Sequence, residues 1–186
     1  MEKLTQEEFR KELLSGRKDW FSEDLSGLDL SGLDLSGFTL VDADLSGARL
    51  NATNVSRATL SRANLSGAVL VDCDLTGAKL SRVDLSGADM TSAHLFGANL
   101  TRANLTCANL SGANLTKARL RRANLTRANL SNAVLVDCDL TRANLTGATV
   151  FGAAFTRAIL VDVVLENVCL LKARFSGSQF SRSPPE

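Results

Sequence analysis

The chain has 186 residues, with 21 basic and 20 acidic side chains and a formal net charge of +1. No stretch approaches the eighteen consecutive apolar residues of a membrane-spanning helix, so we expect no membrane span and no membrane partner. The N-terminal segment MEKLTQEEFRKELL is charged throughout and has no signal-peptide apolar region, which predicts a cytoplasmic protein.

Residues 4–16 are predicted to form a short α-helix. Thr5 is a favourable N-cap, and Glu8, three residues later, completes a capping box. Leu4 and Phe9 have the spacing of a hydrophobic staple. We expect this helix to cover the N-terminal end of the repeat that follows. A membrane-surface or partner-binding helix is the less favoured alternative, because its polar face mixes both signs of charge.

A five-residue repeat follows the helix. Every fifth residue from Leu25 to Phe180, 32 positions in succession, is apolar and mostly leucine; we call this position i. Position i−2 is mostly alanine, i−1 is mostly aspartate or asparagine, i+1 is mostly serine or threonine, and i+2 is often glycine or charged. Positions i−2 and i share one face of an extended segment. The chain must then turn, because charged side chains at i+2 cannot be buried unpaired. A strict five-residue period makes no stripe on an α-helix, so the repeat predicts stacked extended edges.

The arginines at i+2 indicate how many pentads make one coil. Arginine recurs there every twenty residues from Arg62 to Arg142, so four pentads, one edge each, should form a four-sided coil. We therefore predict an all-β solenoid, a right-handed quadrilateral parallel β-helix of about eight coils with a short N-terminal α-helical cap. Its domains are a capping helix and lead-in at 1–19, the β-helix at 20–182 and a tail at 183–186. Trp20 and Phe21 are expected to close the first coil.

The pentads resemble the A(D/N)LXX signature of the pentapeptide-repeat protein family. Ala123-Asn124-Leu125-Thr126-Arg127 is one such run, and the resemblance covers residues 20–182. It implies a right-handed quadrilateral β-helix with leucine at the centre of each face. It implies less about activity, because most members lack an assigned role. Some members bind DNA gyrase as DNA mimics, which is expected to need a strongly acidic surface and a C-terminal dimer.

The middle of the solenoid should carry a row of like charges along one corner. Residues 57–142 contain eleven basic and six acidic residues, whereas residues 22–56 contain one and six. With coils about 4.8 Å apart, one corner should align five side chains, which we call the arginine row. Its members are Arg62, Arg82, Arg102, Arg122 and Arg142. A solvated corner is the favoured interpretation. The alternative is an anion-binding ridge for nucleic acid, an acidic protein or anionic lipid. It lacks the interleaved aromatic residues of single-strand binders.

Outward positions become apolar toward the C-terminus, which predicts a contact surface. Either this surface supports a homodimer through the C-terminal end, or it packs beneath the segment after Phe175. Phe155, Phe175 and Phe180 should widen the interior ladder. The candidate contact residues are Phe151, Ile159, Val161, Val164 and Leu171.

No residue pattern predicts catalysis, a cofactor or a metal site. His94 is the single histidine and should point outward, and the aspartates and serines repeat at every coil. Cys73 and Cys138 should lie in the core, and Cys107 and Cys169 should point outward as reduced thiols. We predict a non-enzymatic scaffold for an unidentified protein partner. Polyanion or nucleic-acid binding along the arginine row and DNA-mimic inhibition of gyrase are the alternatives.

Overall fold

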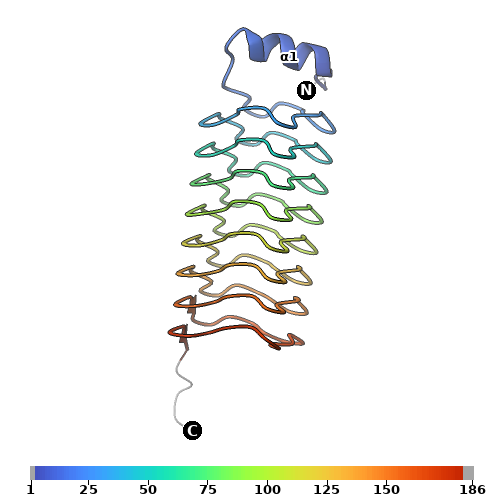
Figure 1. The fold of residues 1–186 in the computed structure, drawn as a ribbon. Coiled ribbons are helices and arrows are strands. Elements are labelled where there is room, and N and C mark those ends of the chain that lie inside the picture. The colour runs from blue at the N-terminus through green and yellow to red at the C-terminus, as the bar shows by residue number, and fades with distance from the viewer. Residues whose placement is uncertain (1–2, 182–186) are drawn as a thin grey trace.

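The computed structural model describes residues 3–181, which form one helix followed by a stack of coils (Figure 1). Helix α1 spans Gln6–Leu14. Parallel bridges then join residues twenty apart, from Asp19 and Thr39 to Ala154 and Arg174. Two edges at the end are long enough to be strands, β1 at Ile159–Leu160 and β2 at Gln179–Phe180. Because every bridge spans twenty residues, the prediction of four pentads per coil is confirmed, with a single bridge on most edges.

Hydrogen bonds between coils follow the same two patterns along the stack. The N–H of a residue at i donates to the carbonyl 19 residues later, as Leu105 does to Asn124 at 2.7 Å. The N–H at i−1 donates to the carbonyl 21 residues earlier, as Asn104 does to Val83 at 2.9 Å. Each coil thus bonds both neighbours, and extended edges this short form a β-helix. Its right-handed winding stays a prediction, and residues 182–186, with the predicted tail, lie outside the described residues.

The residue at i+2 makes every corner. From Ser22 to Gly177, φ at this position lies between 52° and 71°, the left-handed region that glycine adopts most easily. The aspartate or asparagine at i−1 supports the same turn. Asp44 Oδ1 accepts from the N–H of Ser46 at 2.9 Å, an Asx turn that recurs at many corners. The pentad therefore encodes both the inward face and the turn.

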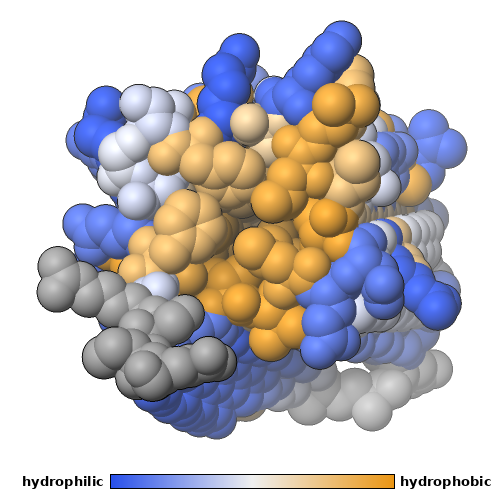
Figure 2. Space-filling view, turned by 90° about the horizontal axis from the view of Figure 1, so that it is seen from below, coloured by the Kyte–Doolittle hydropathy of each residue, from blue (hydrophilic) through white to orange (hydrophobic). Residues whose placement is uncertain are grey.

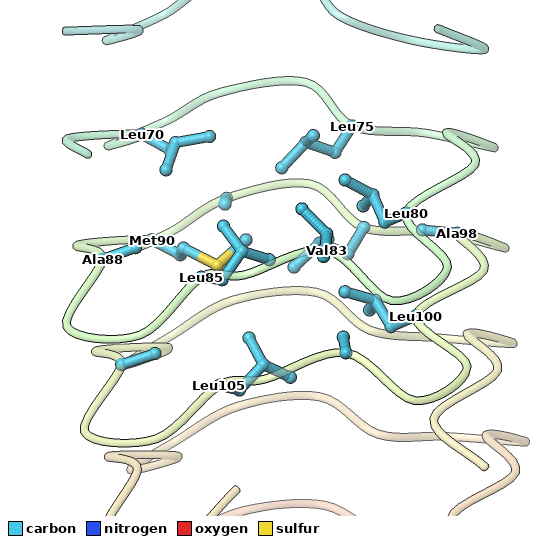
Figure 3. Close-up of a cluster of buried hydrophobic side chains, with 14 of the residues drawn as sticks. Leu70, Leu75, Leu80, Val83, Leu85, Ala88, Met90, Ala98, Leu100 and Leu105 are labelled. Carbon is cyan, nitrogen blue, oxygen red and sulfur yellow. The ribbon is translucent and has the colours of Figure 1, made fainter. Parts of the chain in front are cut away.

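The interior is filled by ladders of leucine at i and smaller residues at i−2 (Figure 3). Leu85 and Leu105, one coil apart, are fully buried, as are Ala88, Met90 and Ala98. Burial continues to Leu160, and Val163 and Leu165 beyond it are only partly buried. Leucine and alanine therefore pack a continuous core along the axis.

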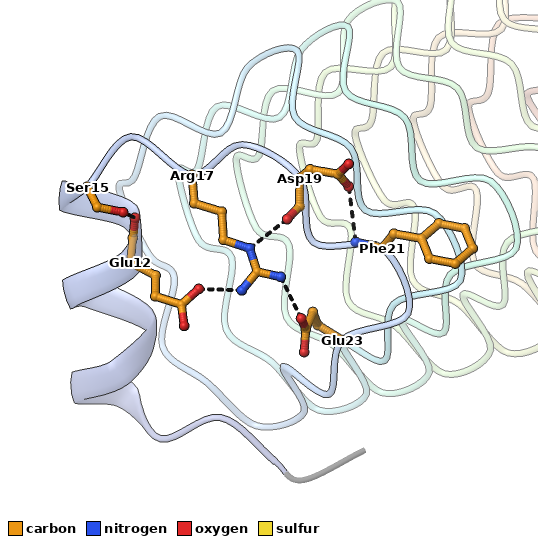
Figure 4. A network of polar contacts seen from close by, with 6 residues as sticks. All are labelled: Glu12, Ser15, Arg17, Asp19, Phe21 and Glu23. Atoms are coloured by element: carbon orange, nitrogen blue, oxygen red, sulfur yellow. Dashed lines mark hydrogen bonds and ion pairs between the residues drawn. The ribbon is translucent and has the colours of Figure 1, made fainter.

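Helix α1 closes the N-terminal end (Figures 1 and 4). The capping box of Thr5 and Glu8 is present, which confirms the predicted N-cap, although the helix is shorter, at Gln6–Leu14, than the predicted 4–16. Phe9 is buried and its ring centre lies 4.7 Å from that of Trp20, which is fully buried. The prediction for Phe21 was wrong: this ring is 54% exposed, because it occupies an outward i+1 position.

No helix within residues 3–181 has the length and apolar character that crossing a membrane requires.

Candidate functional site

The five residues of the arginine row lie on one corner, as predicted, with exposed side chains in successive coils. The two ends of the row are ion-paired. Arg62 binds Asp42 of the preceding coil through Nε at 2.7 Å and Nη2 at 2.5 Å. Arg142 binds Asp162 of the following coil through Nε at 3.3 Å. The hydrogen bond from Arg62 holds the pKa of Asp42 below its ordinary value. The pKa of Asp162 is also lowered, first by Ser181 and then by Arg142.

The middle of the row borders an open depression of about 290 Å³. Within the described chain, Arg82, Arg102 and Arg122 make no ion pair and no side-chain hydrogen bond. Arg121, which also borders the depression, pairs with Asp139 at 3.2 Å. The remaining lining residues are the hydroxyl-bearing Ser81 and Thr101. Sequence reasoning missed these two residues, although they occupy i+1 beside the row and the twenty-residue period aligns them.

The five predicted contact residues near the C-terminus do not share one face. Phe151 and Leu171 lie in one column, 41% and 61% exposed. Ile159 and Val161 lie on a different face and are half-buried, and Val164 lies on a third face. The five residues therefore surround the last two coils rather than form a single lateral patch.

The C-terminal end of the stack is itself apolar (Figure 2). Leu170 and Phe180 occupy inward positions, yet they are 44% and 49% exposed because no further coil follows within residues 3–181. Phe175 stacks on Phe155 with ring centres 5.0 Å apart, and Phe180 lies 5.8 Å from Phe175. The predicted interior ladder thus ends in an exposed ring. We call this surface the open end, made of Val163, Leu165, Val168, Leu170, Phe175 and Phe180.

The segment after Phe175 continues the final coil. The backbone N–H of Arg157 donates to the carbonyl of Ser176 at 2.9 Å, and the backbone N–H of Gln179 donates to the carbonyl of Ala158 at 2.9 Å. Its described part, up to residue 181, therefore forms an edge of the coil beside the preceding one. This described part of the segment therefore does not cover the five predicted contact residues.

The groups that could carry chemistry are dispersed. His94 is exposed between Asp74 and Asn114 of the adjacent coils. Cys73 and Cys138 are buried, and burial raises the pKa of each thiol to about 12. Cys107 and Cys169 are exposed and free. Across residues 3–181, no three His, Cys, Asp or Glu side chains are placed to hold a metal ion.

Comparisons with known proteins identify the five-residue repeat. The sequence model for pentapeptide repeats matches in eight copies, over residues 24–62, 58–97, 84–122, 93–132 and 123–160. No curated protein matched the sequence.

Three solved structures illustrate the similarity. QnrB1, a plasmid-mediated fluoroquinolone resistance protein, in a trypsin-treated variant, is 20% identical with a TM-score of 0.63, over 88% of this chain and 86% of its own. HetL, from the cyanobacterium Nostoc sp. strain PCC 7120 and involved in heterocyst differentiation regulation, is 28% identical over 97% and 95%, with a TM-score of 0.41. A pentapeptide repeat protein of the Arabidopsis thaliana thylakoid lumen is 26% identical over 76% and 71%, with a TM-score of 0.36.

The QnrB1 likeness, at its low identity, concerns the fold alone. The family match is more specific, because it extends from residue 24 to residue 160 in the register of the stacked coils. This chain belongs to the pentapeptide-repeat family.

Proposed function

We propose that this chain is a non-enzymatic interaction scaffold that pairs with a second copy of itself through the open end. A filled solenoid offers flat faces, and the depressions on its surface are open rather than enclosed. Catalysis usually needs a partly dry pocket with convergent polar groups. A rigid repeat array is suited instead to displaying its faces to a protein partner. The cytoplasmic location remains part of this proposal.

The difference between the two ends supports pairing of like ends. Helix α1 covers the first coil, and Phe9 of the helix and Trp20 of the coil are buried between them. The last coil exposes Leu170 and Phe180, and its outer backbone groups have no further coil to bond within residues 3–181. A head-to-tail contact would have to displace the helix. Two open ends can meet through the same residues on each copy, which closes the assembly at a dimer.

Sedimentation equilibrium of the full chain tests this proposal. We expect a dimer at micromolar concentration, and Leu171→Glu should shift it toward monomer because it places a charge beside the open end. Leu14→Glu is the matched control, because Leu14 is 87% exposed at the opposite end of the stack. Circular dichroism establishes that both variants remain folded. A native chain that is monomeric at 100 μM would refute the dimer, and two variants with the same mass distribution would refute pairing through the open end.

DNA-mimic inhibition of gyrase is the less supported alternative. A DNA mimic should present a strongly acidic surface, whereas residues 57–142 carry five more basic than acidic residues. We therefore expect no inhibition in a gyrase supercoiling assay when the protein is in molar excess over the enzyme. Inhibition in that assay would make this alternative the better one.

A further inference from the structure

The corner that carries the arginine row is built without glycine. Its described residues are Ser22, Asp42, the five arginines and Asp162, all with positive φ. Each of the other three corner columns contains several glycines, for example Gly67, Gly112 and Gly77. A left-handed conformation costs a side-chain-bearing residue roughly 1 kcal/mol or more relative to glycine. Arginine therefore occupies the same corner of five successive coils, although the left-handed backbone conformation there favours glycine.

A carboxylate is paired with the arginine at each end of the arginine row. Asp42 neutralises Arg62 at one end, and Asp162 neutralises Arg142 at the other. Between them, Arg82, Arg102 and Arg122 stand in three successive coils, about 4.8 Å apart per step. No carboxylate pairs with these three guanidinium groups within residues 3–181. Like charges at this spacing repel one another, and a bound anion would relieve that repulsion.

Hydroxyl groups accompany the three free guanidinium groups. Ser81 and Thr101 border the same depression, as does Arg121, whose guanidinium group pairs with Asp139 at 3.2 Å. Guanidinium groups bind phosphate oxygens through paired N–H donors. Thr101 already donates its hydroxyl hydrogen to Asn99 at 2.7 Å, and the hydroxyls of Ser81 and Ser61 share a hydrogen bond at 3.0 Å, so the free donors at the depression are the guanidinium groups. We propose that Arg82, Arg102 and Arg122, with Ser81, Thr101 and Arg121, form a binding site for a short oligophosphate chain.

The limits of the site favour a short chain over a nucleic acid strand. The three guanidinium groups span two coil steps, about 10 Å. A strand that continued along the corner would meet Asp42 at one end and Asp162 at the other. Single-strand binders also stack bases on aromatic rings, and no aromatic residue lines the depression. A chain of a few phosphates, inorganic or as the tail of a nucleotide, can pair with the three guanidinium groups without reaching the flanking carboxylates and without aromatic rings to stack on.

Calorimetric titration with sodium tripolyphosphate tests the site. The test variant is the triple substitution Arg82→Asn, Arg102→Asn and Arg122→Asn. Asparagine tolerates this corner, because Asn132 and Asn167 occupy equivalent positions with φ of 58° and 56°. The matched control, Arg57→Asn, Lys117→Asn and Arg127→Asn, removes three charges from other corners that also have positive φ.

We expect tripolyphosphate to bind the native chain and to bind at least tenfold more weakly to the test variant, with the control within twofold of native. The single variant Arg102→Asn gives a second measurement if the triple variant is poorly folded. Equal affinity for ATP and tripolyphosphate would indicate that the site recognises only the phosphate chain, whereas tighter ATP binding would identify a nucleotide as the ligand.

Three results would overturn the proposal. They are the absence of binding to the native chain, an equal loss in the control variant, and tighter binding of a DNA oligonucleotide than of tripolyphosphate. The last result would instead assign the row to nucleic acid. The outcome is independent of the proposed dimer, because the row lies on the middle coils and the open end on the last one.

Discussion

Arg17 lies over Trp20, with its guanidinium carbon 4.3 Å from the centre of the ring. The same guanidinium binds Glu12 of helix α1 and Glu23 of the first coil (Figure 4). These hydrogen bonds, first the one to Glu12 and then the one to Glu23, raise the pKa of Arg17 above its ordinary value. Trp20 therefore joins the helix to the solenoid by packing, and Arg17 joins them by charge.

Trp20→Ala should lower the free energy of unfolding by about 3–5 kcal/mol, because it leaves a cavity beneath the helix. Arg17→Ala should cost about 1 kcal/mol, through loss of the cation–π contact and of partly exposed ion pairs. Urea unfolding followed by circular dichroism measures both. Arg10→Ala, at an exposed position of α1, is the control and should change stability little. A Trp20→Ala variant as stable as this control would show that the helix does not stabilise the first coil.

The corner conformation can be tested at Gly67, where φ is 63° and no atom lies within 4 Å of the position that a β-carbon would take. Gly67→Val should destabilise the protein by about 1–2 kcal/mol more than Gly67→Asn, because asparagine tolerates the left-handed region and a β-branched residue does not. Urea unfolding of the two variants gives the difference. Equal destabilisation would mean that packing, not backbone conformation, limits the residue at this corner.

The four cysteines should divide into two classes toward a thiol reagent. Burial raises the pKa of Cys73 and of Cys138 to about 12, so neither forms thiolate near neutral pH. Cys107 and Cys169 are exposed. Native protein should therefore react with DTNB at two thiols within minutes, and unfolded protein should react at four. A Cys107→Ser variant should react at one. Rapid reaction of all four thiols in the native state would contradict the buried positions of Cys73 and Cys138.

The coil could be predicted from the pentad because different positions of the pentad determine the inward face and the turn. Leucine at i and alanine at i−2 specify the inward face, and Asp44, with Ser46 two residues later, specifies a turn. The rule fails where burial depends on a neighbouring coil rather than on the pentad. Leu170 and Phe180 obey the inward pattern and are nevertheless exposed, since no coil follows them within the described chain.

The candidate sites were predictable to the same extent. The twenty-residue period placed the arginine row on one corner, because register alone determines which residues stack. The pairing of Arg62 with Asp42, and the depression beside Arg82 and Arg102, depend on side-chain conformations that periodicity does not specify. Predicting the open end requires knowing where the stack ends and which end the helix covers, and neither can be inferred from a single pentad.

Acid should destabilise the first coils. Hydrogen bonds from Ser26, Ser31 and Ser36 lower the pKa values of the carboxyl groups at Asp24, Asp29 and Asp34. Their folded pKa values thus lie below the unfolded value of about 3.9. The unfolded state binds more protons near that pH, so this stabilisation is present above pH 4 and is lost as pH falls through the folded pKa values.

The free energy of unfolding in urea should therefore decrease as the pH is lowered from about 5 to 3. Asp34→Asn should reduce this decrease, because the asparagine oxygen can still accept the N–H of Ser36, as Asn54 accepts that of Ser56 at 3.0 Å. Asp72→Asn is the matched control, because Asp72 makes no ion pair or side-chain hydrogen bond within residues 3–181. If the two variants lose stability with pH equally, the Asx turns are not the origin of the acid sensitivity.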